Sequence, residues 1–312
     1  MPTLAAMHCV PFELGPTEAY PSLEHWLADA PGTVATMLHR WDLTAGEAYV
    51  GGMSGSVLRV TDSAGTPLVL KVTYPHVEGV WEAVGLQMFP SGLAPTVLRQ
   101  DPWTWSMLLT EVDPGIPLAS EEMSPTEALQ IAGRLHHELT ASAAPTGLPR
   151  LTDAMAEYAA TARDNLPQHS SALHFLGVDA LVEQALDALP ELSASGPTGS
   201  LLHGDFNPGN ILRSSSGWVV IDPKPLVGDP AFDLWPLVTQ IGAPLTTTDP
   251  VSKVRDQLIT AARAAECDWH RTARWAELRT ALNVVWHLTS KETDLAAAEA
   301  FALTVWSQIV RG

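Results

Sequence analysis

The first third of the chain alternates apolar and polar positions in a way that predicts a small antiparallel sheet. Residues 49–60 fit a strand, a glycine-rich turn and a second strand, and residues 67–72 fit a third strand. Residues 103–109 alternate again and predict a further strand, with Trp103 and Trp105 packed into the core from one of its faces. We therefore expect a meander of short strands near the beginning of the chain.

Helical periodicity dominates the rest of the chain. Between the predicted strands, apolar positions in residues 77–88 recur at helical spacing and predict one helix. A second helix should begin at Ser124-Pro125-Thr126-Glu127, which combines an N-cap serine, a proline in the first turn and a capping-box glutamate. Further helical patterns begin at 22–27 and cover 152–189, with a break at Pro167, 233–239, 251–265, 273–288 and 295–310.

A polar turn at residues 203–210 interrupts this pattern and carries the most informative chemistry. Its glycines and proline exclude a helix, so Asp205 and Asn210 should lie on a tight loop, while Asp222 follows a predicted strand at residues 218–221. Each residue alone would be explained by turn capping. Together they form the set that phosphoryl transfer requires, namely one Asp that orients the attacking hydroxyl and an Asn and an Asp that hold Mg²⁺ on the phosphates of ATP. The sequence thus predicts a kinase with catalytic Asp205 and metal ligands Asn210 and Asp222.

The strands near the beginning of the chain supply candidates for binding the nucleotide. Gly51, Gly52 and Gly55 lie in the hairpin, where the lack of a side chain lets backbone N–H groups approach phosphate oxygens. Lys71 lies on the third predicted strand, from which a lysine can reach the α- and β-phosphates. Glycines in a hairpin are often only a turn, and the downstream magnesium set favours the nucleotide interpretation.

These motifs resemble a known family. His203-Gly204-Asp205 with Asn210 is similar to the catalytic loop of the aminoglycoside phosphotransferase superfamily, small-molecule kinases with a protein-kinase-like fold. The stretch 221–234, which contains Asp222-Pro223-Lys224-Pro225, resembles the streptomycin 6-phosphotransferase and hydroxyurea phosphotransferase branch in particular. The motif match covers about residues 50–240, and the C-terminal helices match only in general character.

The resemblance implies an α+β, two-lobed protein-kinase-like fold, with a small antiparallel-sheet N-lobe and a larger, mostly helical C-lobe. We expect the N-lobe, with the glycine-rich hairpin and the nucleotide lysine, at residues 1–112. The C-lobe, with the catalytic and metal loops and the acceptor site, should cover residues 113–312. In this superfamily the strand before the hinge between lobes leads to backbone groups that bind the adenine edge. That position corresponds to Glu111 and Val112.

The same resemblance assigns a partner to the nucleotide lysine. In the family, the helix after the lysine strand carries a glutamate that pairs with that lysine. Glu82, inside Trp81-Glu82-Ala83, matches best, and Glu78, one turn earlier, is its rival. Two solvent-facing acids on an amphipathic helix would be the plain structural alternative.

Supporting roles follow for four further residues. His203 is predicted to order the catalytic loop through hydrogen bonds rather than to transfer protons. Lys224 either contacts phosphate or forms an ion pair with an acidic neighbour. The family's Gly-Asp-Pro-x-x-Asp segment corresponds to Asp229, expected to tie the metal loop to the catalytic loop, and Asp233, expected to cap the following helix.

Composition and charge narrow the class of protein. The 312 residues are 46% hydrophobic and 17% charged, which is typical of a globular chain with a substantial core. No apolar run approaches membrane-spanning length and no signal peptide is recognised, so we expect a cytoplasmic protein. The two cysteines, Cys9 and Cys267, have no metal-like spacing and should be free thiols. The net charge of −18 argues against nucleic acid or an anionic membrane as partner. It suits a cationic or polar small-molecule acceptor, or simply keeps the protein dispersed.

The predicted function is that of an ATP- and Mg²⁺-dependent small-molecule kinase, a phosphotransferase with an alcohol group as acceptor. The resemblance implies that the acceptor is an aminoglycoside such as streptomycin, or hydroxyurea, and that the reaction inactivates an antibiotic. Two alternatives are compatible with the same motifs: a metabolic kinase of a sugar, amino sugar or amino alcohol, and a nucleotide-binding regulator without transfer activity. Both a monomer and a homodimer are compatible with the sequence. Candidate residues for the acceptor pocket wall are Trp235, Gln240, Trp286 and His287.

Overall fold

The computed structural model describes residues 9–13, 22–49, 55–141 and 146–312. Contacts divide the chain into two compact units, residues 1–117 with 210–225, and residues 118–209 with 226–312. The lobe bounds expected from the sequence, 1–112 and 113–312, differ from these units chiefly at residues 210–225, which pack with the first unit. Gly51 and Gly52, two of the predicted phosphate-binding glycines, lie outside the described residues.

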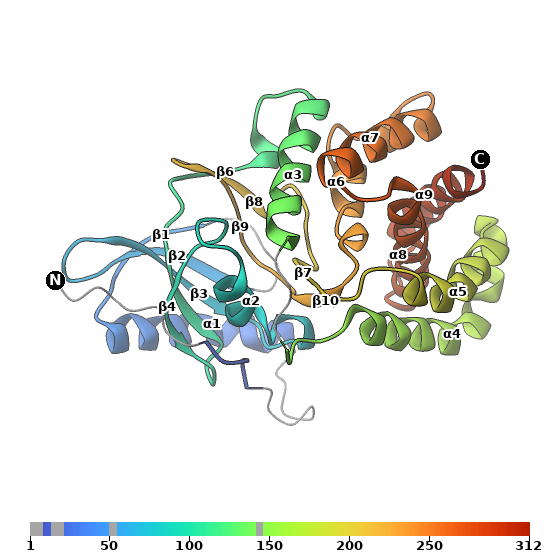
Figure 1. The fold of residues 1–312 in the computed structure, drawn as a ribbon. Coiled ribbons are helices and arrows are strands. Elements are labelled where there is room, and N and C mark those ends of the chain that lie inside the picture. Colours follow the sequence, from blue (N-terminus) through green and yellow to red (C-terminus); the bar gives the residue numbers. More distant parts are fainter. Residues whose placement is uncertain (1–8, 14–21, 50–54, 142–145) are drawn as a thin grey trace. The chain divides into compact units, whose positions relative to one another are not determined.

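The first unit contains a five-stranded antiparallel sheet in which neighbouring strands are β1, β2, β3, β5 and β4 (Figure 1). Its strands are β1 Thr44–Ala48, β2 Gly55–Thr61, β3 Pro67–Thr73, β4 Val97–Asp101 and β5 Ser106–Thr110. The predicted meander is therefore present. Lys71 lies in the middle of the sheet, opposite Val57 on β2 and Met107 on β5.

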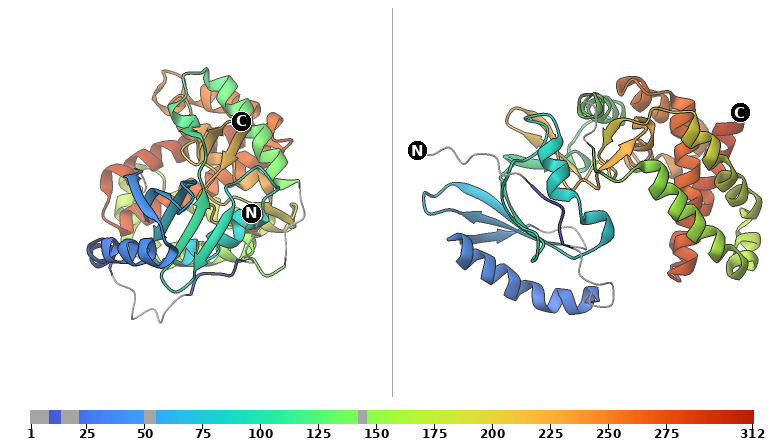
Figure 2. Two further views of the ribbon diagram at one scale, coloured as in Figure 1. Left: turned by 90° about the vertical axis from the view of Figure 1, so that its left-hand side faces the viewer. Right: turned by 60° about the horizontal axis from the view of Figure 1, so that its bottom comes forward.

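Alternation along β3 separates the core side of the sheet from the side that carries Lys71. Leu68, Leu70 and Val72 pack in one cluster with Trp26 and Met37 of α1 Leu23–Trp41, which lies along that face of the sheet (Figure 2). Because side chains alternate between faces, Lys71 points to the opposite face. The helix predicted from residues 22–27 is present, and the Ser22 hydroxyl caps it by accepting a hydrogen bond from the His25 N–H.

Two predicted elements of this unit differ from the structure. The helix expected at residues 77–88 is split into a 3₁₀ turn, η2 Val77–Gly79, and a short helix, α2 Glu82–Met88. The strand expected at residues 103–109 begins only at Ser106, because Trp105 has a left-handed φ of 53° that ends strand geometry there.

The two tryptophans before β5 consequently lie in different surroundings. Trp105 is 2% exposed and stacks on Phe12 with ring centroids 4.9 Å apart, as expected of a core residue. Trp103 lies in the turn and is 78% exposed, so the prediction that it packs in the core from the same strand face was wrong. The error arose because the alternation of apolar residues continues through a turn that contains no strand.

A second, three-stranded sheet completes the first unit. Its strands, in order of pairing, are β6 Pro114–Pro117, β8 Ile211–Ser214 and β9 Gly217–Val220. The β8–β9 hairpin is antiparallel, with Ile211 opposite Val220. The residues just before β8 and just after β9 therefore lie at the same end of this hairpin.

The second unit is mostly helical (Figure 1). Its helices are α3 Pro125–Thr140, α4 Leu151–Leu176, α5 Asp179–Ala194, α6 Trp235–Gln240, α7 Pro250–Ala264, α8 Trp269–Thr289 and α9 Thr293–Arg311. Three 3₁₀ turns, η3 Leu118–Ser120, η4 Pro230–Phe232 and η5 Pro244–Thr246, and a two-stranded ladder of β7 Ser200–Leu202 with β10 Leu226–Gly228 accompany them. Among the described residues, no helix combines the length and apolar character that crossing a membrane would require.

Helix ends in this unit test the sequence-based predictions. The Ser124 hydroxyl accepts a hydrogen bond from the Glu127 N–H at the beginning of α3, which confirms the predicted cap. The predicted break at Pro167 was wrong, because α4 continues through it and ends at Gly177, which has a left-handed φ of 71°. Pro167 is exposed, and the helix of 26 residues continues through it although a proline removes one backbone hydrogen bond.

The core of the second unit holds the strands that lead to its polar turn. Buried side chains of α4, α5, α8 and α9 form one hydrophobic cluster that also includes Leu202 of β7 and Phe232 of η4. β7 runs directly into His203, and its partner β10 runs into Asp229. Because the two strands are antiparallel, with Leu226 opposite Leu202 and Gly228 opposite Ser200, the polar turn and the Gly-Asp-Pro segment leave opposite ends of this ladder.

Candidate active site

In the first unit, Lys71 forms a buried cluster with two carboxylates. Its Nζ lies 2.6 Å from Glu82 Oε1 and 2.5 Å from Asp222 Oδ1. The Lys71 and Glu82 side chains are 9% and 5% exposed, whereas that of Asp222 is 45% exposed. Burial alone would lower the pKa of Lys71, but the two carboxylates outweigh it and raise the pKa above its ordinary value, so the ammonium stays charged. The sequence left Glu82 and Glu78 as candidate partners of Lys71, and the structure pairs Lys71 with Glu82.

Asp222 and Asn210 lie at the same end of the β8–β9 hairpin. Asn210 directly precedes β8, and its carbonyl accepts a hydrogen bond of 3.0 Å from the Ile221 N–H, next to Asp222. Asp222 has a left-handed φ of 57°, which is uncommon for a residue with a side chain and is found preferentially at functional sites. The hairpin thus brings the side-chain amide of Asn210 and the partly exposed carboxylate of Asp222 to the same end. Both groups carry hard oxygen atoms.

This pair of residue types fits a magnesium ion. Mg²⁺ takes oxygen ligands and is usually held by only one or two carboxylates, with waters and phosphates completing its shell. In the described part of the chain, no group of three or more His, Cys, Asp or Glu side chains is arranged to hold a metal by itself. The donor set at the hairpin end is therefore suited to a cation that is bound together with phosphates rather than to a dedicated metal cage.

Lys224 lies two residues after Asp222 and forms an ion pair. Its Nζ is 2.9 Å from Glu78 Oε2, and the two side chains are 37% and 43% exposed. Of the two alternatives left open by the sequence, phosphate contact or an acidic neighbour, the structure contains the second.

The predicted catalytic turn, up to Gly209, belongs to the second unit and is held by a buried carboxylate. Asp233 accepts hydrogen bonds from the backbone N–H groups of His203, at 2.8 Å, and Gly204, at 2.9 Å. The Asp205 N–H donates to His203 Nδ1 at 3.3 Å, and the Asn207 side-chain amide donates to Asp205 Oδ1 at 3.0 Å. His203 is thus hydrogen-bonded within the loop as predicted, and Asp205, which is partly exposed, projects from a turn with a fixed backbone.

A histidine from α3 joins the carboxylate that holds this turn. His136 Nε2 lies 3.5 Å from Asp233 Oδ2, and both side chains are fully buried. Burial alone would raise the pKa of Asp233, but His136 and the N–H of His203 hold it below its ordinary value, so Asp233 remains a carboxylate. The rings of His136 and His203 both pack against Phe206, with centroids 5.2 and 5.6 Å away. Local sequence contains no signal for the contact of His136 with Asp233, because the two residues are far apart in the sequence.

The partners predicted for Asp229 and Asp233 were wrong, because each carboxylate binds other groups in the structure. Asp233 ties down the catalytic loop and does not cap the helix after it, since α6 begins beyond Leu234 without a side-chain cap. Asp229 instead accepts hydrogen bonds from the Ala231 N–H at 3.0 Å and from Trp275 Nε1 at 2.6 Å, and it pairs with Arg271. It therefore anchors the Gly-Asp-Pro segment to α8 rather than to the catalytic loop.

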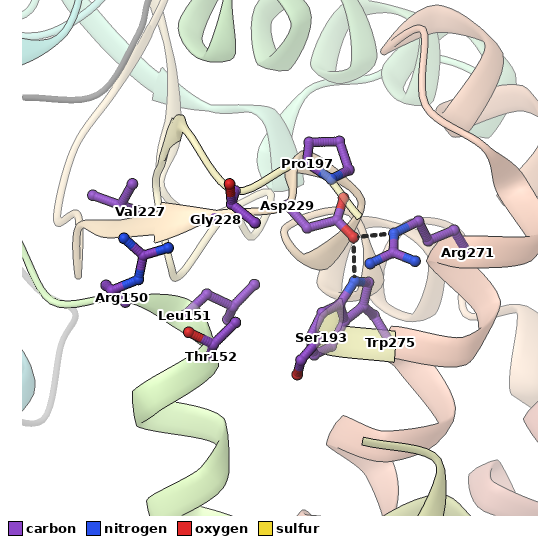
Figure 3. A pocket seen from close by; sticks show the side chains of 11 residues that line it. Arg150, Leu151, Thr152, Ser193, Pro197, Val227, Gly228, Asp229, Arg271 and Trp275 are labelled. Atoms are coloured by element: carbon purple, nitrogen blue, oxygen red, sulfur yellow. Dashed lines mark hydrogen bonds and ion pairs between the residues drawn. The ribbon is translucent and has the colours of Figure 1, made fainter. Parts of the chain in front are cut away.

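Figure 3 shows this anchor at the edge of a small pocket. Arg271 and Trp275 both reach Asp229 from α8, and Leu151 and Val227 line the same pocket. The guanidinium of Arg271 also donates to the Leu192 carbonyl and the Ser195 hydroxyl, so it has protein partners on every side. This arrangement indicates a structural ion pair, which no local sequence pattern predicts because its members are more than 40 positions apart.

Replacing Arg271 by methionine is expected to lower the free energy of unfolding by about 3–5 kcal/mol, because a buried carboxylate would remain without its cation. The side chains of Asp229 and Arg271 are 5% and 16% exposed. Urea denaturation followed by circular dichroism measures the effect. The double variant Arg271→Met with Asp229→Asn serves as control and should recover part of the loss. A loss below about 1 kcal/mol for Arg271→Met would contradict a buried anchor.

The remaining predicted site residues lie in the first unit. Gly55 is the first residue of β2 and pairs with Thr73 of β3, so it belongs to a strand rather than to the turn. Glu111 directly follows β5, and its carboxylate binds Arg59 at 2.8 Å and the Tyr49 hydroxyl at 2.9 Å. The Glu111 side chain is therefore engaged with β2, which leaves the expected adenine contact to backbone groups.

The two cysteines are free thiols, as predicted. Burial raises the pKa of Cys9 to about 11. Burial, followed by the nearby carboxylates of Asp229, Asp233 and Asp268, raises the pKa of Cys267 to about 12. Both therefore stay protonated near neutral pH, and neither is an activated nucleophile.

The folds of the two units and the residue groups described in each of them define a class of protein. An antiparallel sheet with a buried Lys–Glu pair, a hairpin with Asn and Asp at one end, and a helical unit with an Asp-bearing turn are together typical of small-molecule kinases with a protein-kinase-like fold. A family model described as "aminoglycoside/hydroxyurea antibiotic resistance kinase" matches residues 40–290, and the chain belongs to this family. The predicted resemblance, fold class and class of enzyme, a phosphotransferase, are confirmed.

Comparisons with individual proteins agree with that membership. The chain is 32% identical to the streptomycin 6-kinase of Streptomyces glaucescens, over 92% of this chain and 91% of that protein. It is 30% identical to the hydroxyurea phosphotransferase of Kitasatospora aureofaciens, over 86% of this chain and 76% of that protein. A crystal structure of an aminoglycoside phosphotransferase in ternary complex with AMP-PNP and hygromycin B is similar in fold, with a TM-score of 0.61 and 17% identity. That match covers 89% of this chain and 97% of that one.

Proposed function

We propose that this chain transfers the γ-phosphate of ATP to a hydroxyl group of a streptomycin-like aminoglycoside and thereby inactivates the antibiotic. The observation that carries the proposal is the 32% identity to a streptomycin 6-kinase over 92% of the chain. That span includes Lys71, Asp205, Asn210 and Asp222, the residues required for phosphoryl transfer. The net charge of −18 also favours a cationic acceptor.

Within this proposal, the first unit binds the nucleotide. Lys71, held by Glu82, would contact the α- and β-phosphates, and Gly51, Gly52 and Gly55 would border them. Backbone groups at 111–112 would bind the adenine edge, as the family resemblance implies. The contact of 2.5 Å between Lys71 and Asp222 is compatible with this role, since it keeps a cation at the place where phosphates would be bound.

Asn210 and Asp222 would hold Mg²⁺, which when bound neutralises negative charge on the phosphates. Asp205 would orient the acceptor hydroxyl and accept its proton, from a turn whose shape Asp233 fixes by two backbone hydrogen bonds. Phosphoryl transfer depends mainly on positioning and electrostatic stabilisation, so a rigid turn is an advantage for a residue in this role.

Hydroxyurea is the second acceptor to consider. The identity to the hydroxyurea phosphotransferase, 30%, is close to the identities to two streptomycin 6-kinases, 32% and 29%. Sequence identity alone therefore does not separate the two acceptors. The charge of the chain favours streptomycin, which is cationic, over hydroxyurea, which is neutral.

Incubation of the purified chain with Mg²⁺, ATP and either streptomycin or hydroxyurea tests the proposal. We expect streptomycin to gain one phosphate, detected by mass spectrometry, and ADP to form in equal amount. Asp205→Ala is the control and should not phosphorylate either acceptor. Turnover only of a sugar, amino sugar or amino alcohol would replace the proposal by a metabolic kinase. Binding of ATP without turnover of any acceptor would replace it by a nucleotide-binding regulator.

A further inference from the structure

The segment that follows β9 runs along η2 and α2. At one end, the Val220 N–H donates a hydrogen bond of 2.8 Å to the carbonyl of Leu93, a few residues after α2. At the other end, Lys224 forms its ion pair of 2.9 Å with Glu78 of η2. Asp222 lies between these contacts and reaches Glu82 through Lys71. Residues 220–225 therefore contact η2 directly, reach Glu82 of α2 through Lys71, and bind the chain a few residues after α2.

The middle of α2 fits closely against the same segment. A Cβ atom at Gly85 would lie 2.8 Å from Cγ of Pro225, which is closer than real Cβ atoms come, and 3.3 Å from Cγ of Pro223, which is tighter than most such contacts. Gly85, Pro223 and Pro225 are all buried. A glycine at this position lets the helix approach the proline rings, and the prolines restrict the backbone on either side of Lys224.

α2 depends on such outside contacts for its position. It has only seven residues and no side-chain hydrogen bond at its N-cap. Helices shorter than about 12–15 residues are marginal in water by themselves, so tertiary packing must hold this one in place. Because α2 carries Glu82, whatever positions α2 also positions the ammonium group of Lys71.

We propose that Glu78, Gly85, Lys224 and Pro225 form a brace that positions α2, and with it Glu82 and Lys71, relative to Asp222. These four are positioning residues, which act on the nucleotide-binding groups without contacting the reacting atoms. The expected changes in kcat and KM rest on the proposed function. The expected ordering of α2 does not depend on it. On this basis the Lys224 ammonium acts through Glu78 and not as a ligand of the phosphates.

The ion pair can be tested by exchanging its charges. We expect Lys224→Met and Glu78→Gln each to lower kcat about two- to fivefold, the range for a partly exposed pair, with KM for ATP nearly unchanged. The double variant should be no worse than either single one, and the reversal Glu78→Lys with Lys224→Glu should restore kcat. Arg163→Met is the control, because it removes another ion pair of nearly the same length, 3.0 Å to Asp187, between α4 and α5 of the second unit. It should leave kcat unchanged.

Hydrogen–deuterium exchange supplies a readout that does not need an acceptor. We expect faster exchange of the α2 amides, and not of those in α1, in Lys224→Met and more strongly in Gly85→Ala, where the added methyl group displaces Pro225. The Arg163→Met control should leave exchange in α2 unchanged.

Several results would overturn the brace. One is a raised KM for ATP in Lys224→Met alone, which would indicate direct phosphate contact. Another is a reversal variant, Glu78→Lys with Lys224→Glu, that does not recover kcat. The last is unchanged hydrogen–deuterium exchange of the α2 amides in Lys224→Met and Gly85→Ala. If the wild-type chain phosphorylates none of the acceptors, the proposed function fails, while exchange in α2 still decides whether the brace exists.

Discussion

Replacing Asp205 by alanine is expected to lower kcat by about 10²–10⁴-fold, the usual contribution of a positioned general base. The carboxylate is partly exposed on the turn, as a residue that meets an acceptor hydroxyl must be. The turn itself should survive, because its backbone is held by the hydrogen bonds from His203 and Gly204 to Asp233, which the substitution does not touch.

The measurement for Asp205→Ala is steady-state and single-turnover phosphorylation of the acceptor, with ATP affinity determined by calorimetry. We expect nearly unchanged affinity for ATP and an unchanged unfolding temperature, so that the loss lies in the chemical step. Asp205→Asn keeps the size of the side chain and should lose as much activity, since the amide cannot accept the proton. Activity within about tenfold of wild type in both variants would remove Asp205 from its proposed role.

Replacing Lys71 by methionine should lower both stability and turnover. Glu82, with a side chain 5% exposed, would remain buried without its cation, which typically lowers the free energy of unfolding by about 3–5 kcal/mol. The control is Lys71→Met with Glu82→Gln. It removes both charges and should recover much of the stability, but no activity, because the phosphates still lack their ammonium group.

This loss of stability should depend on pH in a defined direction. Burial raises the pKa of Glu82, and Lys71 opposes that rise in the wild-type chain. Without Lys71, the folded state of the variant holds a proton on Glu82 at pH values where the unfolded chain has released it, so stability falls as the pH increases. Lys71→Met should therefore lose less stability at about pH 5 than at about pH 8. Urea denaturation at both values checks this, and an equal loss at both would show that Glu82 finds another partner.

Much of the candidate site could be predicted from sequence because its motifs are short and chemically constrained. Lys71, Glu82, Asn210 and Asp222 were each selected from local spacing and family resemblance, and the structure places all four in the first unit. Asp205 was selected in the same way and lies on the expected turn. The sheet and the long helices were also predictable, because their periodicity extends over many residues.

The errors arose where a distant residue decides the outcome. Asp229 and Asp233 are similar in local sequence, but Arg271 and Trp275, both on α8, engage only the first, and the catalytic turn engages the second. No local pattern distinguishes such partners, since hydrogen bonds between elements depend on how those elements pack. For the same reason, the sequence could not decide whether Lys224 contacts phosphate or an acidic side chain, whereas the structure shows Glu78 beside it.

The sequence by itself determined which chemical groups this protein carries and the family to which it belongs. Few functions other than phosphoryl transfer use an Asp, an Asn and a second Asp at this spacing in turns. Only the tertiary structure decided which glutamate pairs with Lys71, which aspartate holds the catalytic turn, and what Lys224 contacts. Residue type and spacing are local properties that can be read directly from the amino-acid sequence. Partnership between side chains depends on contacts that form only when segments far apart in sequence are packed together.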